Sequence, residues 1–163
     1  MRSIRYFGKG VLKLVDAPEP QITRPDDIKI KVAYCGVCGS DLHFKRAELD
    51  FLFDAENGTP IGHEATGNIT ELGPAATSKG LQVGDRVTYY YNEHCGNCYY
   101  CRNGQEQFCS NMTGTSAAMS DYIVVREQSV HKLEDTCSLE RGALIEPISV
   151  CLHGIDLARI KCG

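Results

Sequence analysis

The sequence lacks any apolar stretch that approaches the length of a membrane span. Such a span needs about 20 mostly apolar residues in a row, and the apolar runs in this chain are far shorter. The first ten residues, MRSIRYFGKG, alternate apolar and polar side chains and contain no apolar core of the kind found in a secretory signal. We therefore expect a cytoplasmic protein with no membrane partner.

An excess of positive charge is also absent. The 163 residues include 17 Lys or Arg and 21 Asp or Glu, which gives a formal net charge of −4. A nucleic-acid-binding domain usually carries a basic patch, so we predict no nucleic-acid partner. Hydrophobic residues make up 42% of the chain and charged residues 23%, which is typical of a globular protein. The length suits one domain with a core of its own.

A glycine-rich dinucleotide fingerprint is missing as well. Gly8 and Gly10 form a Gly-x-Gly pair, but Lys13 occupies the position of the third glycine. That glycine turn normally brings a helix N-terminus against the pyrophosphate of the dinucleotide. We therefore expect this chain to bind no dinucleotide by itself.

Short strand patterns dominate the first 130 residues. Ile28, Ile30 and Val32 alternate with lysines, which predicts a half-buried strand. Similar runs predict strands at 4–7, 11–15, 66–72, 86–90 and 121–125. The consecutive tyrosines at 89–91 favour a strand with alternating faces over a substrate pocket. Many short strands separated by turn residues indicate a rolled or closed β structure.

The pattern changes after Ser138. From there, apolar residues recur at spacings of three and four, which predicts helices over about 138–160. Ser138 is a suitable N-cap, and Pro147 either starts a second helix or kinks the first.

The most specific motif is a run of four closely spaced cysteines: Cys95, Cys98, Cys101 and Cys109. Four thiolates complete the tetrahedral shell of Zn²⁺ and leave no open position, so this spacing predicts a structural zinc site. The cysteine total of nine is odd and the spacings are clustered, which favours metal binding in a reducing compartment over disulfides. We expect a structural-zinc lobe over about residues 92–112 whose folding depends on the metal.

A second, looser set of ligand types contains Cys38, His63, Glu64 and Glu146. Cys35 and Cys38 form a CxxC of their own, but no further free CxxC remains to complete a second structural site. A catalytic zinc site needs three protein ligands and one open position. Cys38, His63 and one carboxylate supply that number, although the spacing fits His63 in a buried turn equally well.

Five segments together resemble a known family. CGVCGSDLH, GHEATG, VGDRV, CGNCYYCRNGQEQFC and LIEP, in this order, are similar to the zinc-dependent medium-chain dehydrogenases, the alcohol and polyol dehydrogenase superfamily. The similarity extends over essentially the whole chain. It implies a mainly β fold with helices, namely a GroES-like β-barrel catalytic domain spanning residues 1–163. In the family a Rossmann domain follows, and the resemblance places its first strand beyond Gly163, so that domain is absent from this chain.

The resemblance also implies metal ligands. Cys38 and His63 match two ligands of the family's catalytic zinc. The third ligand is a cysteine in classical alcohol dehydrogenases, but Glu146 stands at that position here. This resembles the polyol, threonine, butanediol and glucose dehydrogenase branch, in which the residue matching Glu64 can also approach the metal. Glu64 and Glu146 therefore compete for one role.

Further roles follow from the same resemblance. Ser40 matches the hydroxyl that relays the substrate proton, and His43 matches the more distant relay histidine. Asp41 matches an acidic residue that orients a zinc histidine. Without the family, Ser40 would be interpreted as a helix N-cap and His43 as a partly exposed helix residue.

These observations predict an enzyme with two zinc sites. The full-length protein would use NAD(P) to oxidise a secondary alcohol of a polyol or vicinal diol to a ketone, and would be a homo-oligomer, whereas this chain alone would be inactive. One alternative is a parent similar to threonine dehydrogenase. Another is a stand-alone zinc-binding module without redox chemistry.

Overall fold

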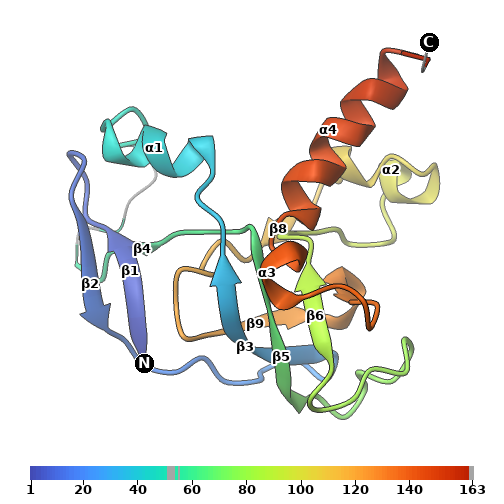
Figure 1. Ribbon diagram of the computed structural model, residues 1–163, viewed down its shortest axis with the longest axis horizontal. Coiled ribbons are helices and arrows are strands. Elements are labelled where there is room, and N and C mark those ends of the chain that lie inside the picture. The colour runs from blue at the N-terminus through green and yellow to red at the C-terminus, as the bar shows by residue number, and fades with distance from the viewer. Residues whose placement is uncertain (51–53, 55, 162–163) are drawn as a thin grey trace.

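The computed structural model describes residues 1–50, 54 and 56–161 (Figure 1). The strands are β1 (Arg2–Tyr6), β2 (Leu12–Asp16), β3 (Asp27–Cys35), β4 (Thr59–Pro60), β5 (Ala65–Leu72), β6 (Arg86–Tyr89), β7 (Asn92–Glu93), β8 (Thr113–Gly114), β9 (Tyr122–Arg126) and β10 (Val130–Lys132). The helices are α1 (Gly39–Lys45), α2 (Tyr99–Arg102), α3 (Leu139–Gly142) and α4 (Ile145–Leu157), with 3-10 turns η1 (Glu106–Phe108) and η2 (Glu127–Ser129). The fold is mainly β with few helices, as the sequence predicts.

A five-stranded antiparallel sheet in the order β10-β6-β5-β3-β9 carries the core. Ile28 and Ile30 of β3 are fully buried, which confirms the predicted alternation on that strand. Lys29 departs from it, because its side chain is also buried. Its amine contacts Glu19 and lies 5.6 Å from the centre of the Tyr122 ring, so the charge is paired within the fold.

The closed barrel expected from the sequence is not observed among the described residues. The sheet is rolled but open, because its edge strands β9 and β10 pair only with β3 and β6, respectively. Turn η2 connects the two edges, and Glu127 in this turn accepts hydrogen bonds from Ser78 Oγ (2.6 Å) and the Lys79 backbone N–H (2.9 Å). Residues 78–79 therefore pack beside turn η2. Among the described residues, no strand pairing joins β9 to β10.

Two smaller sheets flank the main one. β2, β1 and β4 form a three-stranded sheet. It is joined to the segment just before β9 by hydrogen bonds from the Ile4 N–H to the Met119 carbonyl (2.8 Å) and from the Asp121 N–H to the Arg2 carbonyl (3.0 Å). β7 and β8 pair at the base of a loop that contains α2 and η1. We call residues 92–112 of this loop the four-cysteine lobe.

The carboxyl-terminal helices are present where the sequence predicts them. Ser138 caps α3, since its Oγ accepts a hydrogen bond from the Arg141 backbone N–H at 3.2 Å. Of the two alternatives for Pro147, the structure favours the start of a second helix: Pro147 is the third residue of α4, in the first turn, where a missing N–H leaves no helix hydrogen bond unmade. α4 projects away from the sheet (Figure 1), and most of its apolar side chains are exposed. No helix in the described ranges is long and apolar enough to cross a bilayer.

Candidate metal sites

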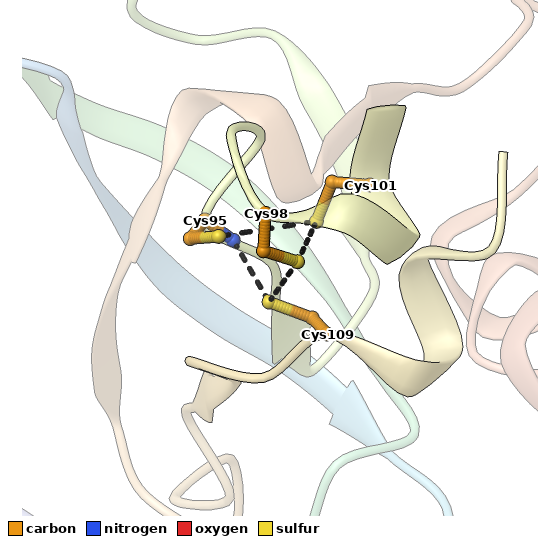
Figure 2. Close-up of side chains that lie close together, drawn as sticks. All are labelled: Cys95, Cys98, Cys101 and Cys109. Atoms are coloured by element: carbon orange, nitrogen blue, oxygen red, sulfur yellow. Dashed lines mark hydrogen bonds between the residues drawn. The ribbon is translucent and has the colours of Figure 1, made fainter. Parts of the chain in front are cut away.

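The four cysteines of the lobe converge on one point (Figure 2). Their sulfur atoms all lie within 4.8 Å of one another. Cys98 Sγ is 3.4 Å from Cys101 Sγ and 3.9 Å from Cys109 Sγ, and Cys95 Sγ is 4.0 Å from Cys101 Sγ. A tetrahedral zinc with Zn–S bonds of about 2.3 Å holds its sulfurs about 3.8 Å apart. The arrangement therefore fits a four-thiolate metal site.

Local backbone geometry brings these thiols together. Cys95 follows β7, Cys98 is the N-cap residue of α2, and Gly96 between them takes the left-handed conformation, with φ of 72°, that the tight turn requires. Backbone hydrogen bonds, first from Cys101 and then from Ser110, lower the pKa of Cys98 to about 6. A metal binds the thiolate form, so Cys98 already favours the charge state that a metal needs. Cys101 does not, because burial, followed by its contact with Cys98, raises its pKa to about 12.

A second group of ligand atoms comes from Cys38, His63 and Glu64. Their ligand atoms all lie within 4.8 Å of one another. Cys38 is the N-cap residue of α1, directly after β3, and the other two precede β5. The Gly36 N–H donates to the Glu64 carbonyl at 2.7 Å, so β3 and the GHE segment are held together. A Cβ atom on Gly36 would lie 2.3 Å from Glu64 Oε2, so only glycine leaves room for that carboxylate.

Glu146 approaches this group from another element but is not a member of it. It lies in the first turn of α4 and is 8% exposed. Burial raises the pKa of its carboxyl, and His63 lowers and Glu64 raises that pKa by smaller amounts. Of the two carboxylates that the resemblance offers as the third zinc ligand, Glu64 is therefore the one whose oxygen lies within 4.8 Å of the ligand atoms of Cys38 and His63.

α1 carries the two residues that the resemblance assigns to proton relay. Ser40 is the second residue of the helix and half-buried, while Cys38 occupies the N-cap position. His43 is exposed, and its Nδ1 contacts Glu48 Oε2, a partner that the sequence analysis missed. Asp41 is buried, and its carboxylate accepts a hydrogen bond from the Cys38 backbone N–H at 2.8 Å. Asp41 therefore caps α1 and holds the Cys38 backbone in place.

Tyr91 is a further residue that the sequence analysis missed. The predicted strand ends at Tyr89, with Tyr89 buried and Tyr90 exposed. Both of these tyrosines line the cleft described below, so the preference for a strand over a pocket was only partly right. The ring of Tyr91, however, packs against the imidazole of His63 with centroids 4.6 Å apart. No local pattern signals this contact, because it joins two segments that meet only in the folded chain.

A cleft of about 600 Å³ is lined by Glu146 but by none of Cys38, His63 and Glu64. It lies between α4 and strands β6 and β10, and its walls include Glu146, Tyr89, His131 and His153. A cleft of this volume is in the range that holds small molecules. Glu146 is thus part of the cleft wall, and the effects of His63 and Glu64 on its pKa show that it also lies within electrostatic range of the second group.

Residues 24–135 match the family model described as "Alcohol dehydrogenase GroES-like domain". This chain belongs to that family. The resemblance to zinc-dependent medium-chain alcohol and polyol dehydrogenases is therefore confirmed, although the closed barrel is not seen here.

Curated relatives carry names of the same kind. D-xylulose reductase A of Aspergillus niger is 32% identical over 99% of this chain and 47% of its own length. D-arabitol-phosphate dehydrogenase of Enterococcus avium is 35% identical over 91% of this chain and 42% of its own length. The chain thus spans about half the length of these relatives.

Solved structures share the fold. Galactitol-1-phosphate dehydrogenase from Escherichia coli superposes with a TM-score of 0.85 and 29% identity, over 98% of this chain and 45% of that one. 2R,3R-butanediol dehydrogenase from Bacillus subtilis gives 0.82 and 29%, over 99% of this chain and 48% of that one. The relatives are oxidoreductases, which supports the view that this chain is part of an enzyme.

Proposed function

We propose that this chain is the catalytic portion of a zinc-dependent, NAD(P)-linked polyol dehydrogenase. The observation that carries the proposal is the mutual approach of Cys38, His63 and Glu64 to within 4.8 Å, in a chain whose other metal-ligand set is composed of four thiols. One set is closed by its own cysteines, and the other leaves a position for substrate. A structural and a catalytic site are thereby distinguished by ligand number.

In the proposed arrangement Glu64 is the third resting ligand, with Cys38 and His63. A zinc ion bound there would supply Lewis-acid chemistry that lowers the pKa of an alcohol towards neutrality. Glu146 stays outside this set and faces it from the cleft wall. Tyr91 fixes the plane of the His63 ring by packing against it.

Ser40 and His43 are proposed to move the substrate proton. Residues three apart on a helix share a face, so the Ser40 hydroxyl and the His43 imidazole lie along one side of α1. Ser40 is half-buried near Cys38, whereas His43 is exposed and contacts Glu48. The Ser40 hydroxyl would take up the substrate proton and the His43 imidazole would release a proton to solvent, with Glu48 stabilising the imidazolium. A bound NAD(P) would supply the hydride acceptor.

Polyols and vicinal diols are the proposed substrates. With Glu64 in the second set and Glu146 close to it, this site has more oxygen donors than a set of two cysteines and one histidine, and carboxylates suit exchange with oxygen ligands. A substrate with two neighbouring hydroxyls can then be oriented at two points. The names of the relatives, which refer to one ketose and two sugar-alcohol phosphates, support this class. Threonine, with an amine beside its hydroxyl, is the nearest alternative.

The test is a comparison of kcat/KM in the complete enzyme for sorbitol, xylitol, 2,3-butanediol, threonine and ethanol. We expect a diol or polyol to rank first and Glu146→Gln to reduce its advantage over ethanol. Glu56→Gln, at an exposed position, is the matched control. Ethanol as the best substrate would contradict the orientation argument, and no activity on any alcohol would favour a non-catalytic zinc module. The proposal also includes a cytoplasmic homo-oligomer as the working form.

A further inference from the structure

A short segment joins the two metal-ligand sets. Tyr91 packs on His63 of the second set, and Cys95 belongs to the first. We call residues 91–95, which include β7, the strap. Its position means that a shift of the four-cysteine lobe would be transmitted within a few residues to the ring that supports His63.

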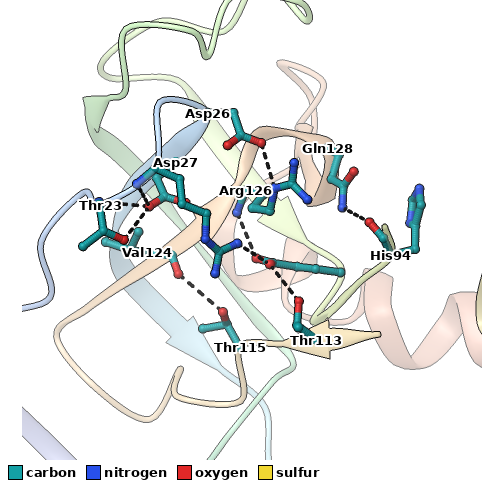
Figure 3. A network of polar contacts seen from close by, with 11 residues as sticks. Thr23, Asp26, Asp27, His94, Thr113, Thr115, Val124, Arg126 and Gln128 are labelled. Atoms are coloured by element: carbon teal, nitrogen blue, oxygen red, sulfur yellow. Dashed lines mark hydrogen bonds and ion pairs between the residues drawn. The ribbon is translucent and has the colours of Figure 1, made fainter. Parts of the chain in front are cut away.

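Glu93 fixes the middle of the strap through hydrogen bonds whose donors include Thr113 and Arg126, both labelled in Figure 3. Its side chain is 4% exposed. The carboxylate accepts hydrogen bonds from Arg24 Nη1 (2.9 Å), the Arg126 backbone N–H (3.0 Å) and Thr113 Oγ1 (3.3 Å). These donors come from the segment before β3, from β9 and from β8. A buried carboxylate is stable only when it is paired in this way, so Glu93 ties the strap to three separate parts of the chain.

The residues on either side of Glu93 are held as well. The Thr115 N–H donates to the Tyr91 carbonyl at 2.9 Å, and Gln128 Nε2 donates to the His94 carbonyl at 2.7 Å. Gly114 lies so close to the Tyr91 carbonyl that a Cβ would be 2.7 Å from it. The strap therefore has little freedom to slide, and its ends keep fixed positions at the two ligand sets.

We infer that Glu93 is a positioning residue that holds the Tyr91 ring against His63 and so couples the four-cysteine lobe to the second metal set. The inference rests on the proposed function, which assigns a metal to Cys38, His63 and Glu64. The hydrogen bonds of the Glu93 carboxylate go to Arg24, Thr113 and Arg126, and none of these is a ligand of either set. Its effect on the second set therefore has to pass through Tyr91.

Cobalt binding to the 163-residue chain tests the inference. One equivalent of Zn²⁺ first fills the four-thiolate set, and Co²⁺ is then titrated while the visible spectrum is recorded. Supporting residues around a metal site are worth about 10- to 100-fold in affinity. We expect Glu93→Ala to weaken cobalt binding at the second set about tenfold. The four-thiolate spectrum of Co²⁺ added first to the metal-free protein should be unchanged.

Three variants separate positioning from general damage. Glu106→Ala removes a carboxylate from the same lobe and should bind Co²⁺ like the wild type. Arg24→Gln removes one exposed donor to Glu93 and should give a smaller loss without unfolding the chain. In a Tyr91→Leu background, Glu93→Ala should cause no further loss, because the two changes interrupt the same path.

The outcomes also separate this inference from the proposed function. Cobalt affinity of Glu93→Ala equal to that of the wild type, or additive losses in the double variant, would overturn the inference alone. A wild-type chain that binds no Co²⁺ beyond the four-thiolate set would overturn both.

Discussion

Gly36→Ala offers a sharp test of Glu64 as a ligand. The added Cβ would lie 2.3 Å from Glu64 Oε2 and 3.1 Å from Glu64 Cβ. Ordinary contact begins near 3.4 Å, so the carboxylate oxygen must move by about 1 Å, whereas metal–ligand distances tolerate about 0.2 Å. The Glu64 backbone remains held by the Gly36 N–H. The substitution therefore displaces the carboxylate and leaves the chain path intact.

We expect metal affinity at the second set to fall at least tenfold, or about 1.4 kcal/mol. Gly39→Ala is the matched control, because it is the same change on the other side of Cys38 and its Cβ would meet no atom within 4 Å. The assay is competitive Zn²⁺ titration with a chromophoric chelator, alongside thermal unfolding. The melting temperatures of the two variants should be similar, since the largest movement falls on the free end of a side chain and Glu64 Cβ, 3.1 Å away, has to give by only a few tenths of an ångström. Equal affinities in Gly36→Ala and Gly39→Ala would refute the assignment of Glu64.

Three further predictions concern the stability of the fold. Cys98→Ser should remove zinc from the four-cysteine lobe and lower the melting temperature, because structural zinc stabilises the folded state. Cys38→Ser should leave the melting temperature nearly unchanged. A larger drop in Cys38→Ser than in Cys98→Ser would show that the two sites are exchanged. Thr66→Val removes the hydrogen bond from Thr66 Oγ1 to the Leu139 carbonyl (2.6 Å) and should cost about 1 kcal/mol in urea unfolding; an unchanged midpoint would contradict this. Hydrogen bonds from Arg2, first from its side chain, lower the pKa of Asp121 below 3.8. The stability difference between wild type and Asp121→Asn should therefore be fully present above pH 3.8 and should vanish as the pH falls through the lowered pKa. Unfolding curves at several pH values would check this.

The strands and helices could be predicted because each follows from a local pattern. The strands predicted at 4–7, 11–15, 66–72, 86–90 and 121–125 match observed strands to within two residues at each end. The alternation in β3 and the helical period after Ser138 both reflect which face each element buries. The four-cysteine set was equally predictable, because its ligands are close in sequence and the intervening turn brings them together.

The unpredicted features depend on contacts between distant segments. Lys29 is buried because Glu19, outside β3, pairs with it. Tyr91 meets His63 only because the segments before β5 and after β6 come together. The choice between Glu64 and Glu146 also depends on the orientation of α4. α3, which directly precedes α4, is set against β5 by the close approach of Gly142 to Thr66, where a Cβ would lie 2.6 Å from the threonine methyl.

The central claim is that this one chain holds two zinc ions in chemically different sites. Zinc content by mass spectrometry, combined with X-ray absorption of the purified chain before and after Cys38→Ser, measures this most directly. We predict two zinc ions, one with four sulfur neighbours and one with a single sulfur and lighter nitrogen or oxygen neighbours, and selective loss of the second in the variant. Loss of the four-sulfur signal in Cys38→Ser, or a wild-type protein that retains no more than one zinc, would contradict the claim.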